Sequence, residues 1–223
     1  MARDVEIIVA DYPSETVGER LAEAARAGAQ IALTGGSTPR HAYEHAAKLE
    51  PDWTNAELWW GDERCVPADD ERSNYWLAKE SLLDRVRTGK VHRIRGELDR
   101  DEAATLYEQE LASLERFDLV LLGLGPDGHV ASLFPCEPTL DETERSVVGA
   151  EARLEPYVDR VTLTLPILRR ARVVLFLVTG ANKADAAHAA FAGDPMREIP
   201  GSLVRATRGE TIAVLDEAAA AKL

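Results

Sequence analysis

The chain has 223 residues, of which 45% are hydrophobic, so it is long enough to bury a large core as one domain over residues 1–223. Its formal net charge of −13 argues against a nucleic-acid partner, because binding to a phosphate backbone requires a broad basic surface. It has no apolar run of the roughly 18 residues that a membrane span needs and no cationic, apolar leader, and its two cysteines suit a reducing compartment, so we expect a soluble cytoplasmic protein with no membrane partner.

Short β-rich runs alternate with helix-like segments, which predicts an α/β fold: a single-domain, doubly wound, mostly parallel sheet with helices on both faces. The strand candidates are VEIIVA (5–10), QIALTG (30–35), AELWWGDE (56–63), FDLVLLGLG (117–125), VTLTL (161–165), RVVLFLVTG (172–180) and TIAVLD (211–216). The helix candidates are 14–28, capped by Ser14 and ended by Gly28, followed by 39–49, 73–84, 101–115 and 182–192. We expect the acidic stretch 137–155 to be an irregular surface connection.

Four strand candidates end in polar or glycine-rich turns, and ligands of doubly wound sheets bind beyond the carboxyl ends of the strands. The first turn is GGSTPR (35–40), in which Pro39 suits the first helical position and Ser37 or Thr38 suits the cap. Free amides, hydroxyls, a positive helix end and an arginine then predict a phosphate site, with an ordinary capped turn as the alternative. The residues that would hold the phosphate are Gly35, Gly36, Ser37, Thr38 and Arg40.

The second turn, GDER (61–64), follows two tryptophans. Asp62 would accept a sugar hydroxyl or orient a catalytic group, and Arg64 would neutralise an anion, with an exposed ion-pair cluster as the alternative. The neighbouring Cys65 suggests a cysteine hydrolase in which His129 is the base, but a lone cysteine is more often a small buried hydrophobe.

The third turn has the spacing G-x-G-x-x-G over 123–128. A dinucleotide site would need a full helix after these glycines and an acidic residue after the next strand, whereas Pro135 and Pro138 allow only about two helical turns. The run predicts instead that His129 lies at a helix start, whose positive end keeps the imidazole neutral and able to act as a general base. A histidine that only satisfies local backbone groups is the alternative.

The fourth turn, TGANK (179–183), places Lys183 at a helix start, where it would add a second cation to a phosphate pocket. His41 and His45 lie four residues apart on a helix candidate, a spacing that suits a metal. The glutamate of H-E-x-x-H and a third ligand are missing, so we predict no metal site and interpret both as surface histidines.

Taken together, LTGGSTPR (33–40), WWGDERCVP (59–67) followed by SNY (73–75), LLGLGPDGHVASLFP (121–135) and VTGANKA (178–184) resemble the 6-phosphogluconolactonase family in order and spacing. The resemblance implies a single-domain α/β fold without metal or organic cofactor. It also implies hydrolysis of a small phosphorylated sugar lactone, 6-phospho-D-glucono-1,5-lactone, in the oxidative pentose phosphate pathway. The related amino-sugar-phosphate isomerases carry a glutamate where this chain has Phe134, which cannot transfer protons.

On this interpretation the catalytic residues are His129, Asp62 and Arg64. His129 activates water, Arg64 or nearby amides stabilise the oxyanion, and Asp62 and Asp127 position hydroxyls, water or the imidazole. The substrate-binding residues are Gly35, Gly36, Ser37, Thr38, Arg40, Asp127 and Lys183. An isomerase or deaminase and a non-catalytic sugar-phosphate sensor remain alternatives, and we expect a monomer or a small homo-oligomer.

Overall fold

The computed structural model describes residues 5–153 and 155–223. Its main sheet contains β1 (Glu6–Val9), β2 (Gln30–Leu33), β3 (Asp52–Trp60), β5 (Arg87–Val91), β6 (Leu119–Leu122), β9 (Val173–Val178) and β10 (Glu210–Leu215). These seven strands lie in the order β1-β10-β9-β6-β2-β3-β5, and every neighbouring pair is parallel. The predicted mostly parallel sheet is confirmed.

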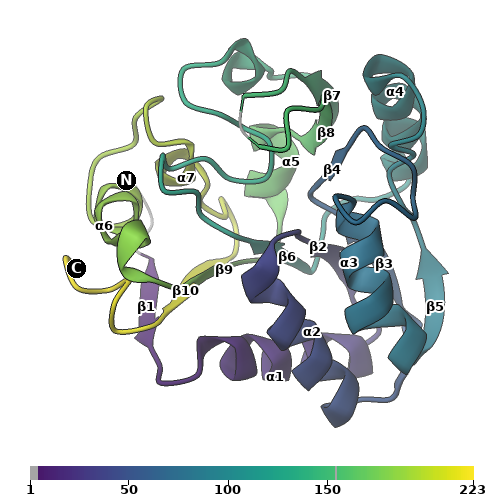
Figure 1. Ribbon diagram of the computed structural model, residues 1–223, viewed down its shortest axis with the longest axis horizontal. Coiled ribbons are helices and arrows are strands. Elements are labelled where there is room, and N and C mark those ends of the chain that lie inside the picture. The colour runs from purple at the N-terminus through teal and green to yellow at the C-terminus, as the bar shows by residue number, and fades with distance from the viewer. Residues whose placement is uncertain (1–4, 154) are drawn as a thin grey trace.

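Helices flank this sheet. They are α1 (Pro13–Arg26), α2 (Ser37–Leu49), α3 (Asn74–Ser81), α4 (Arg100–Leu111), α5 (Leu165–Arg170), α6 (Ala184–Phe191) and α7 (Pro200–Leu203), with short 3-10 turns η1 (Leu83–Arg85), η2 (Pro138–Asp141) and η3 (Ala181–Lys183). In Figure 1, α1 and α2 lie below the line of strands, and α5 and α7 lie above it. None of the described helices has the length and apolar character needed to cross a bilayer.

Helix α1 shows how local sequence sets these elements. Val17, Leu21 and Ala25 recur every four residues and are at most 1% exposed, so they form the face that packs inward. The helix ends as predicted before Gly28, whose φ of 72° suits glycine. The predicted cap is wrong: the helix begins at Pro13 with Tyr12 as its N-cap, and the Ser14 hydroxyl donates instead to the Thr38 carbonyl at 3.4 Å.

The central strands β6 and β9 are buried over almost their whole length. All four residues of β6 (LVLL) and the last five of β9 (VLFLV) are buried. Parallel strands covered by helices on both faces read as continuous apolar runs, which is why both strands are visible in the sequence.

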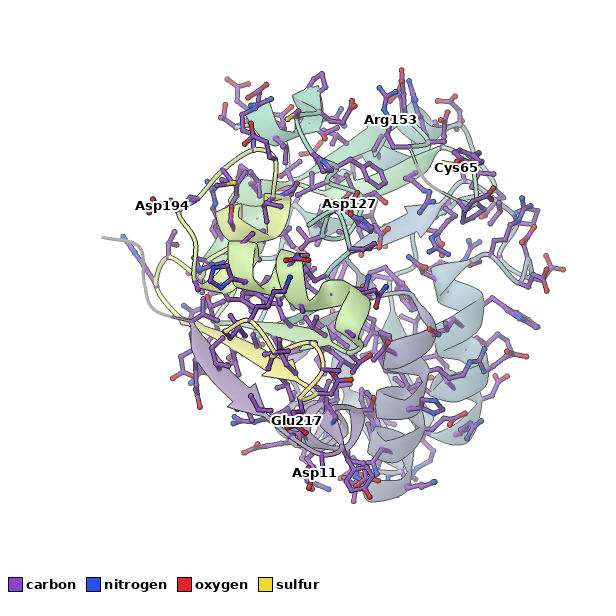
Figure 2. The ribbon with its side chains drawn as sticks, turned by 60° about the vertical axis from the view of Figure 1, so that its left-hand side comes forward. Asp11, Cys65, Asp127, Arg153, Asp194 and Glu217 are labelled. Carbon is purple, nitrogen blue, oxygen red and sulfur yellow. The ribbon has the colours of Figure 1, made fainter. Side chains whose placement is uncertain are left out.

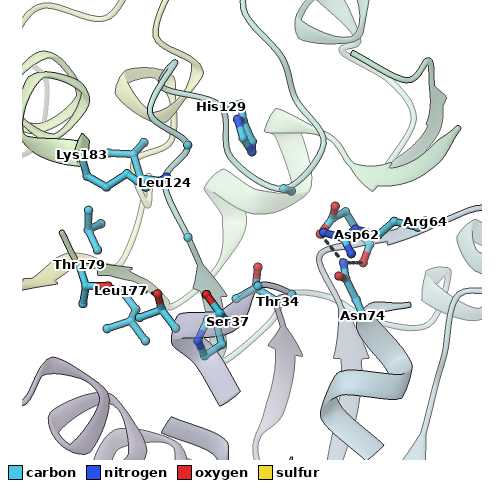
Figure 3. A pocket seen from close by; sticks show the side chains of 18 of the residues that line it. Thr34, Ser37, Asp62, Arg64, Asn74, Leu124, His129, Leu177, Thr179 and Lys183 are labelled. Atoms are coloured by element: carbon cyan, nitrogen blue, oxygen red, sulfur yellow. Dashed lines mark hydrogen bonds between the residues drawn. The ribbon is translucent and has the colours of Figure 1, made fainter. Parts of the chain in front are cut away.

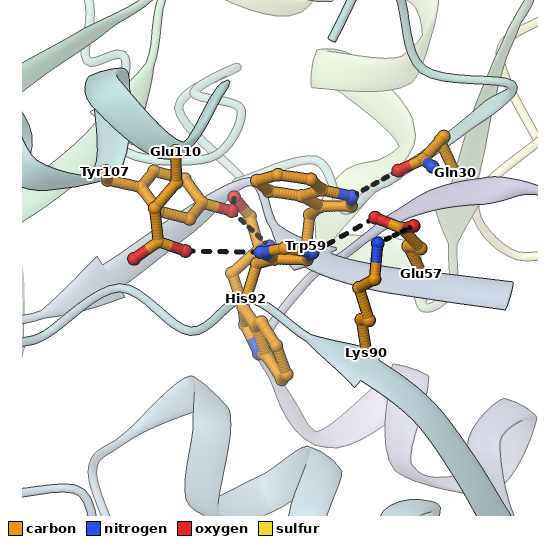
Figure 4. A network of polar contacts seen from close by, with 8 residues as sticks. Gln30, Glu57, Trp59, Lys90, His92, Tyr107 and Glu110 are labelled. Atoms are coloured by element: carbon orange, nitrogen blue, oxygen red, sulfur yellow. Dashed lines mark hydrogen bonds and ion pairs between the residues drawn. The ribbon is translucent and has the colours of Figure 1, made fainter. Parts of the chain in front are cut away.

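Edge strand β5 has a different basis, and the sequence analysis missed it. Lys90 pairs in register with Glu57 of β3 and donates to its carboxylate at 2.8 Å. His92, just beyond β5, stacks on Trp59 with ring centroids 3.7 Å apart (Figure 4). Its two ring nitrogens lie 3.1 Å from Glu57 and 3.2 Å from Glu110 of α4. Ion pairs and ring stacking therefore attach β5 to β3. A search for apolar periodicity does not detect such contacts.

A second sheet of three antiparallel strands contains β4 (Asp62–Arg64), β7 (Val147–Ala150) and β8 (Arg160–Leu163). The prediction that 161–165 joins the parallel sheet is therefore wrong, as is the irregular connection expected over 137–155, which contains η2 and β7. The reason lies at Gly61, whose N–H donates to Leu33 of β2 while its carbonyl accepts from Leu163 of β8. The chain leaves the main sheet at this glycine and starts the small one.

The order of the strands creates a crevice between β2 and β6. From β2 the chain moves outward to β3 and β5, whereas from β6 it moves the opposite way to β9 and β10. The turns after β9, β6, β2 and β3 thus follow four adjacent strands at one edge of the sheet, around a topological switch point, where ligands of such folds bind.

Candidate active site

A buried tyrosine holds the turn after β2. The Tyr43 hydroxyl accepts from the Thr34 N–H at 2.9 Å and donates to the Thr34 carbonyl at 2.6 Å. Burial raises the pKa of Tyr43, so this hydroxyl keeps its proton. The amide hydrogens of Gly35 and Gly36 find no acceptor within 5–153 and 155–223, and Gly36 has a φ of 103°. We call Gly35 and Gly36 the diglycine turn; it presents free N–H groups beside the start of α2.

Helix α2 begins two residues earlier than predicted. Gly36 is its N-cap and Ser37 its first residue, so Pro39 is not the first helical position and neither hydroxyl caps the helix. Arg40 is consequently the fourth helical residue, and its guanidinium pairs with Glu80 at 3.2 Å. The structure therefore does not bring Arg40 to the site.

Strand β4 places Asp62 where three segments meet. Asp62 is 5% exposed; one carboxylate oxygen accepts from the Asn74 amide at 3.0 Å and the other from the Ser132 hydroxyl at 2.7 Å. Asp62 thus joins the surrounding loops, and its carboxylate is hydrogen-bonded to Asn74 and Ser132 rather than to His129. The Arg64 guanidinium donates to the Arg72 carbonyl.

Glu63 points the other way and anchors the start of α3. Its carboxylate accepts from the backbone N–H groups of Arg64, Asn74 and Tyr75 and from the Ser73 hydroxyl, at 2.7 to 2.9 Å. Burial outweighs these donors and raises the pKa of Glu63 to about 6. Glu63 therefore holds the start of α3 against β4.

The loop after β6 carries His129, but not at a helix start. The segment 125–137 forms turns with an isolated bridge between Val130 and Leu133, so no helix dipole acts on His129 and that prediction is wrong. Instead, His129 Nδ1 lies 2.5 Å from Asp127 Oδ1. Although burial raises the pKa of Asp127, its hydrogen bond and charge interaction with His129 lower it overall. This contact orients the ring, and in a neutral imidazole with its proton on Nδ1 the acceptor is Nε2.

These turns enclose a pocket of about 270 Å³. Figure 3 shows Lys183 at the left of the pocket and Arg64, Asp62 and Asn74 at the right, with His129 above and between these two groups and Thr34 and Ser37 below. The lining residues are Thr34, Gly35, Gly36, Ser37, Thr38, Pro39, Asp62, Arg64, Asn74, Gly123, Leu124, Gly125, His129, Ala131, Phe134, Glu155, Arg160, Leu177, Val178, Thr179 and Lys183. The structure thus gathers the predicted site residues except Arg40 and Asp127, and Asp127 contacts the ring of His129 instead.

Cations lie at both ends of this pocket. At one end Lys183 is half-buried, and burial lowers its pKa while Asp127 opposes that shift. The hydroxyls of Thr38 and Thr179 lie 3.1 Å apart, and both residues line the pocket with Lys183. At the other end Arg160 is 4% exposed, and its pKa is lowered by burial and by the charge of Arg64.

The sequence analysis missed Asn74, Arg160 and Thr179. Asn74 was visible within SNY, and Thr179 stands directly after an apolar strand, so both carried a detectable pattern. Arg160 reaches the pocket only because β8 pairs with β4, a pairing that apolar periodicity does not predict.

Cys65 and His41 lie away from the pocket lining. Figure 2 shows Cys65 toward the side of Arg153, apart from Asp127, and burial raises the pKa of the Cys65 thiol to about 11, which opposes a nucleophilic thiolate. His41 is exposed and lies 3.7 Å from Glu44. Within the part of the chain that the structure describes, no three His, Cys, Asp or Glu side chains are grouped to hold a metal ion.

Similar proteins share both the sequence and the fold. The chain is 40% identical to a 6-phosphogluconolactonase of Mycobacterium tuberculosis over 99% of this chain and 96% of that protein, and 38% identical to one of Streptomyces coelicolor over 91% and 85%. The structure of a 6-phosphogluconolactonase from Trypanosoma cruzi superimposes with a TM-score of 0.86 at 30% identity, covering 100% of this chain and 98% of that one. The model of the family described as glucosamine-6-phosphate isomerases/6-phosphogluconolactonase matches residues 8–213, and the chain belongs to this family.

Proposed function

We propose that the chain hydrolyses 6-phospho-D-glucono-1,5-lactone to 6-phosphogluconate, the lactonase step of the oxidative pentose phosphate pathway. The observation that carries this proposal is the imidazole of His129, which lines the pocket between its two cationic ends and is oriented by the Asp127 carboxylate at 2.5 Å. The lactonases at about 40% identity over nearly the whole chain support the same activity.

The phosphate of the substrate would lie at the end formed by the diglycine turn, Ser37 and Lys183. Free backbone N–H groups, a helix start and an ammonium group are the donors that a phosphate requires. This position would direct the lactone ring across the pocket toward His129, Arg64 and Arg160.

His129 would act as the general base. Its Nε2 takes a proton from water as the water oxygen attacks the lactone carbonyl carbon, and Arg64 and Arg160 stabilise the oxyanion. When the tetrahedral intermediate collapses, the bond from the carbonyl carbon to the ring oxygen breaks. The imidazolium returns its proton to that oxygen, which leaves an open-chain acid and the free base.

The isomerase alternative is less favoured because Phe134 stands beside the base. Its ring centroid lies 5.2 Å from that of His129, and it provides no group that transfers a proton to open a sugar ring. A family name alone does not separate the two activities, so this side chain carries the distinction.

The test is proton release at constant pH from freshly generated 6-phosphogluconolactone, corrected for spontaneous hydrolysis. We expect enzyme-dependent release that saturates with the lactone, and no ammonia from glucosamine 6-phosphate. Ammonia release with no lactone turnover would overturn the proposal in favour of the isomerase, and thermal stabilisation by phosphosugars with neither reaction would favour a sensor.

A further inference from the structure

Asn74 is the first residue of α3, is 1% exposed and lines the pocket, although it takes no part in the proposed proton transfers. Its side-chain nitrogen donates to the carbonyl of Asp62 at 2.8 Å and to its carboxylate at 3.0 Å. Both partners are acceptors, so the amide nitrogen must face Asp62 and the amide oxygen must point away from it. That oxygen is buried and has no hydrogen-bond partner among the described residues.

The amide of Asn74 occupies the space beside Gly35 where a side chain would be. A Cβ built on Gly35 would lie 1.8 Å from the Asn74 side-chain oxygen and 2.3 Å from its Cγ, and the three nearest atoms all belong to Asn74. The φ of Gly35 lies outside the left-handed region, so its backbone does not require glycine. Contact with Asn74 is therefore what excludes a side chain from this position of the diglycine turn.

On its other side Asn74 is connected to the loop of the base. The second carboxylate oxygen of Asp62 accepts from Ser132, three residues after His129, and the Ser132 N–H donates to the Thr162 hydroxyl at 3.2 Å. Asp62 and Ser132 are buried as Asn74 is. A continuous buried path thus runs from the proposed phosphate end, through one amide and one carboxylate, to the loop that presents the imidazole.

We propose that Asn74 is a positioning residue that fixes the diglycine turn and the Asp62 carboxylate relative to each other. A substrate held by its phosphate at the turn then has its carbonyl carbon at the correct distance from His129. This inference rests on the proposed lactonase function. Removal of the Asn74 amide takes one hydrogen-bond donor from the Asp62 carboxylate and leaves an unfilled space beside Gly35. Both changes would displace the lactone carbonyl carbon relative to His129.

The first test compares Asn74→Ala with Ser73→Ala. Ser73 caps the same helix by accepting from the Trp76 N–H and donates to Glu63, but it does not line the pocket, so its loss weakens α3 without removing the amide. We expect Asn74→Ala to lower kcat at least about tenfold, the value of a hydrogen bond to a charged group, and Ser73→Ala to change kcat less than about twofold. Thermal melts of both variants measure the loss of stability separately.

The second test is a double-mutant cycle between positions 35 and 74. Gly35→Ala alone drives its methyl group into the Asn74 amide, so we expect a large loss of kcat/KM. If Asn74 is the obstacle, Gly35→Ala combined with Asn74→Ala recovers at least about tenfold of that loss relative to Gly35→Ala alone.

The outcomes separate the two proposals. A wild-type chain that does not turn over the lactone contradicts the proposed function. Normal wild-type turnover, with Asn74→Ala equal to Ser73→Ala in kcat or with no recovery in the double variant, contradicts the role of Asn74. An Asn74→Asp variant adds a check that does not depend on a cavity, because it places a carboxylate oxygen against Asp62 and should lower kcat more steeply as pH rises.

Discussion

The contact between Asp127 and His129 allows a sharp prediction for Asp127→Asn. In the wild type the carboxylate lies 2.5 Å from Nδ1 and favours the tautomer with its proton on that nitrogen, in which Nε2 can take a proton from water. An asparagine at 127 can turn its NH₂ toward Nδ1, which selects the tautomer protonated at Nε2 and blocks the base. The variant therefore tests the orientation of the imidazole without removing it.

The magnitude follows from the exposure of the pair. A hydrogen bond to a charged group is worth about 1.5–3 kcal/mol. The side chains of Asp127 and His129 are 34% and 24% exposed, so solvent screening favours the lower end of that range. Loss of this hydrogen bond alone then lowers kcat about tenfold. The change of tautomer lowers kcat further, up to the contribution of a general base, which is about 10²–10⁴-fold.

The assay is the initial rate of proton release from fresh lactone, over a range of lactone concentrations. KM should change little, because Asp127 does not line the pocket. His129→Asn is the reference for complete loss of the base, and Asp127→Asn should lie between it and the wild type. A kcat close to the wild-type value for Asp127→Asn, or a defect confined to KM, would refute this assignment of the proton.

Two further predictions concern the cations and the buried glutamate. Lys183→Met should raise KM for the phosphorylated lactone with little change in kcat, whereas Arg40→Met should leave both unchanged because Arg40 pairs with Glu80 outside the pocket; an equal effect of the two would refute the location of the phosphate. Glu63→Gln places an NH₂ against the Tyr75 N–H or another backbone N–H that the carboxylate accepts from, and should lower the free energy of unfolding by about 2 kcal/mol. A thermal melt would record this as a fall in Tm of about 4–8 °C. Because burial raises the folded pKa of Glu63 to about 6 from 4.5, its proton adds stability that is complete below pH 4.5 and is lost as the pH rises through 6, and the glutamine variant should lack this dependence; an unchanged pH profile would contradict it.

The sequence predicts the frame of the fold because the frame depends on apolar burial. Strands β6 and β9 are covered on both faces, so continuous apolar runs identify them. Their parallel pairing brings the turns after them to one edge, which is why residues as distant as Gly35 and Lys183 are correctly placed in one pocket.

The predictions are wrong where a side chain's place depends on the exact residue at which a helix starts, or on contacts between polar groups. Because α2 starts at Ser37, Arg40 lies about one helical turn beyond the free amides at the helix N-terminus. At that position its guanidinium pairs with Glu80. The turns after Gly128 replace the helix predicted at His129, so a carboxylate rather than a helix end sets the tautomer. Arg160 reaches the pocket through the antiparallel pairing of β8 with β4; the run VTLTL reveals the strand but not its partner.

In the proposed mechanism the imidazole of His129 performs the chemistry while other groups hold the substrate. The most direct measurement is kcat for His129→Asn on fresh 6-phosphogluconolactone, with the thermal shift produced by 6-phosphogluconate measured on the same sample. We predict that kcat falls about 10²–10⁴-fold while the product still stabilises the variant as it does the wild type. Near-normal turnover by the variant would show that His129 is not the general base.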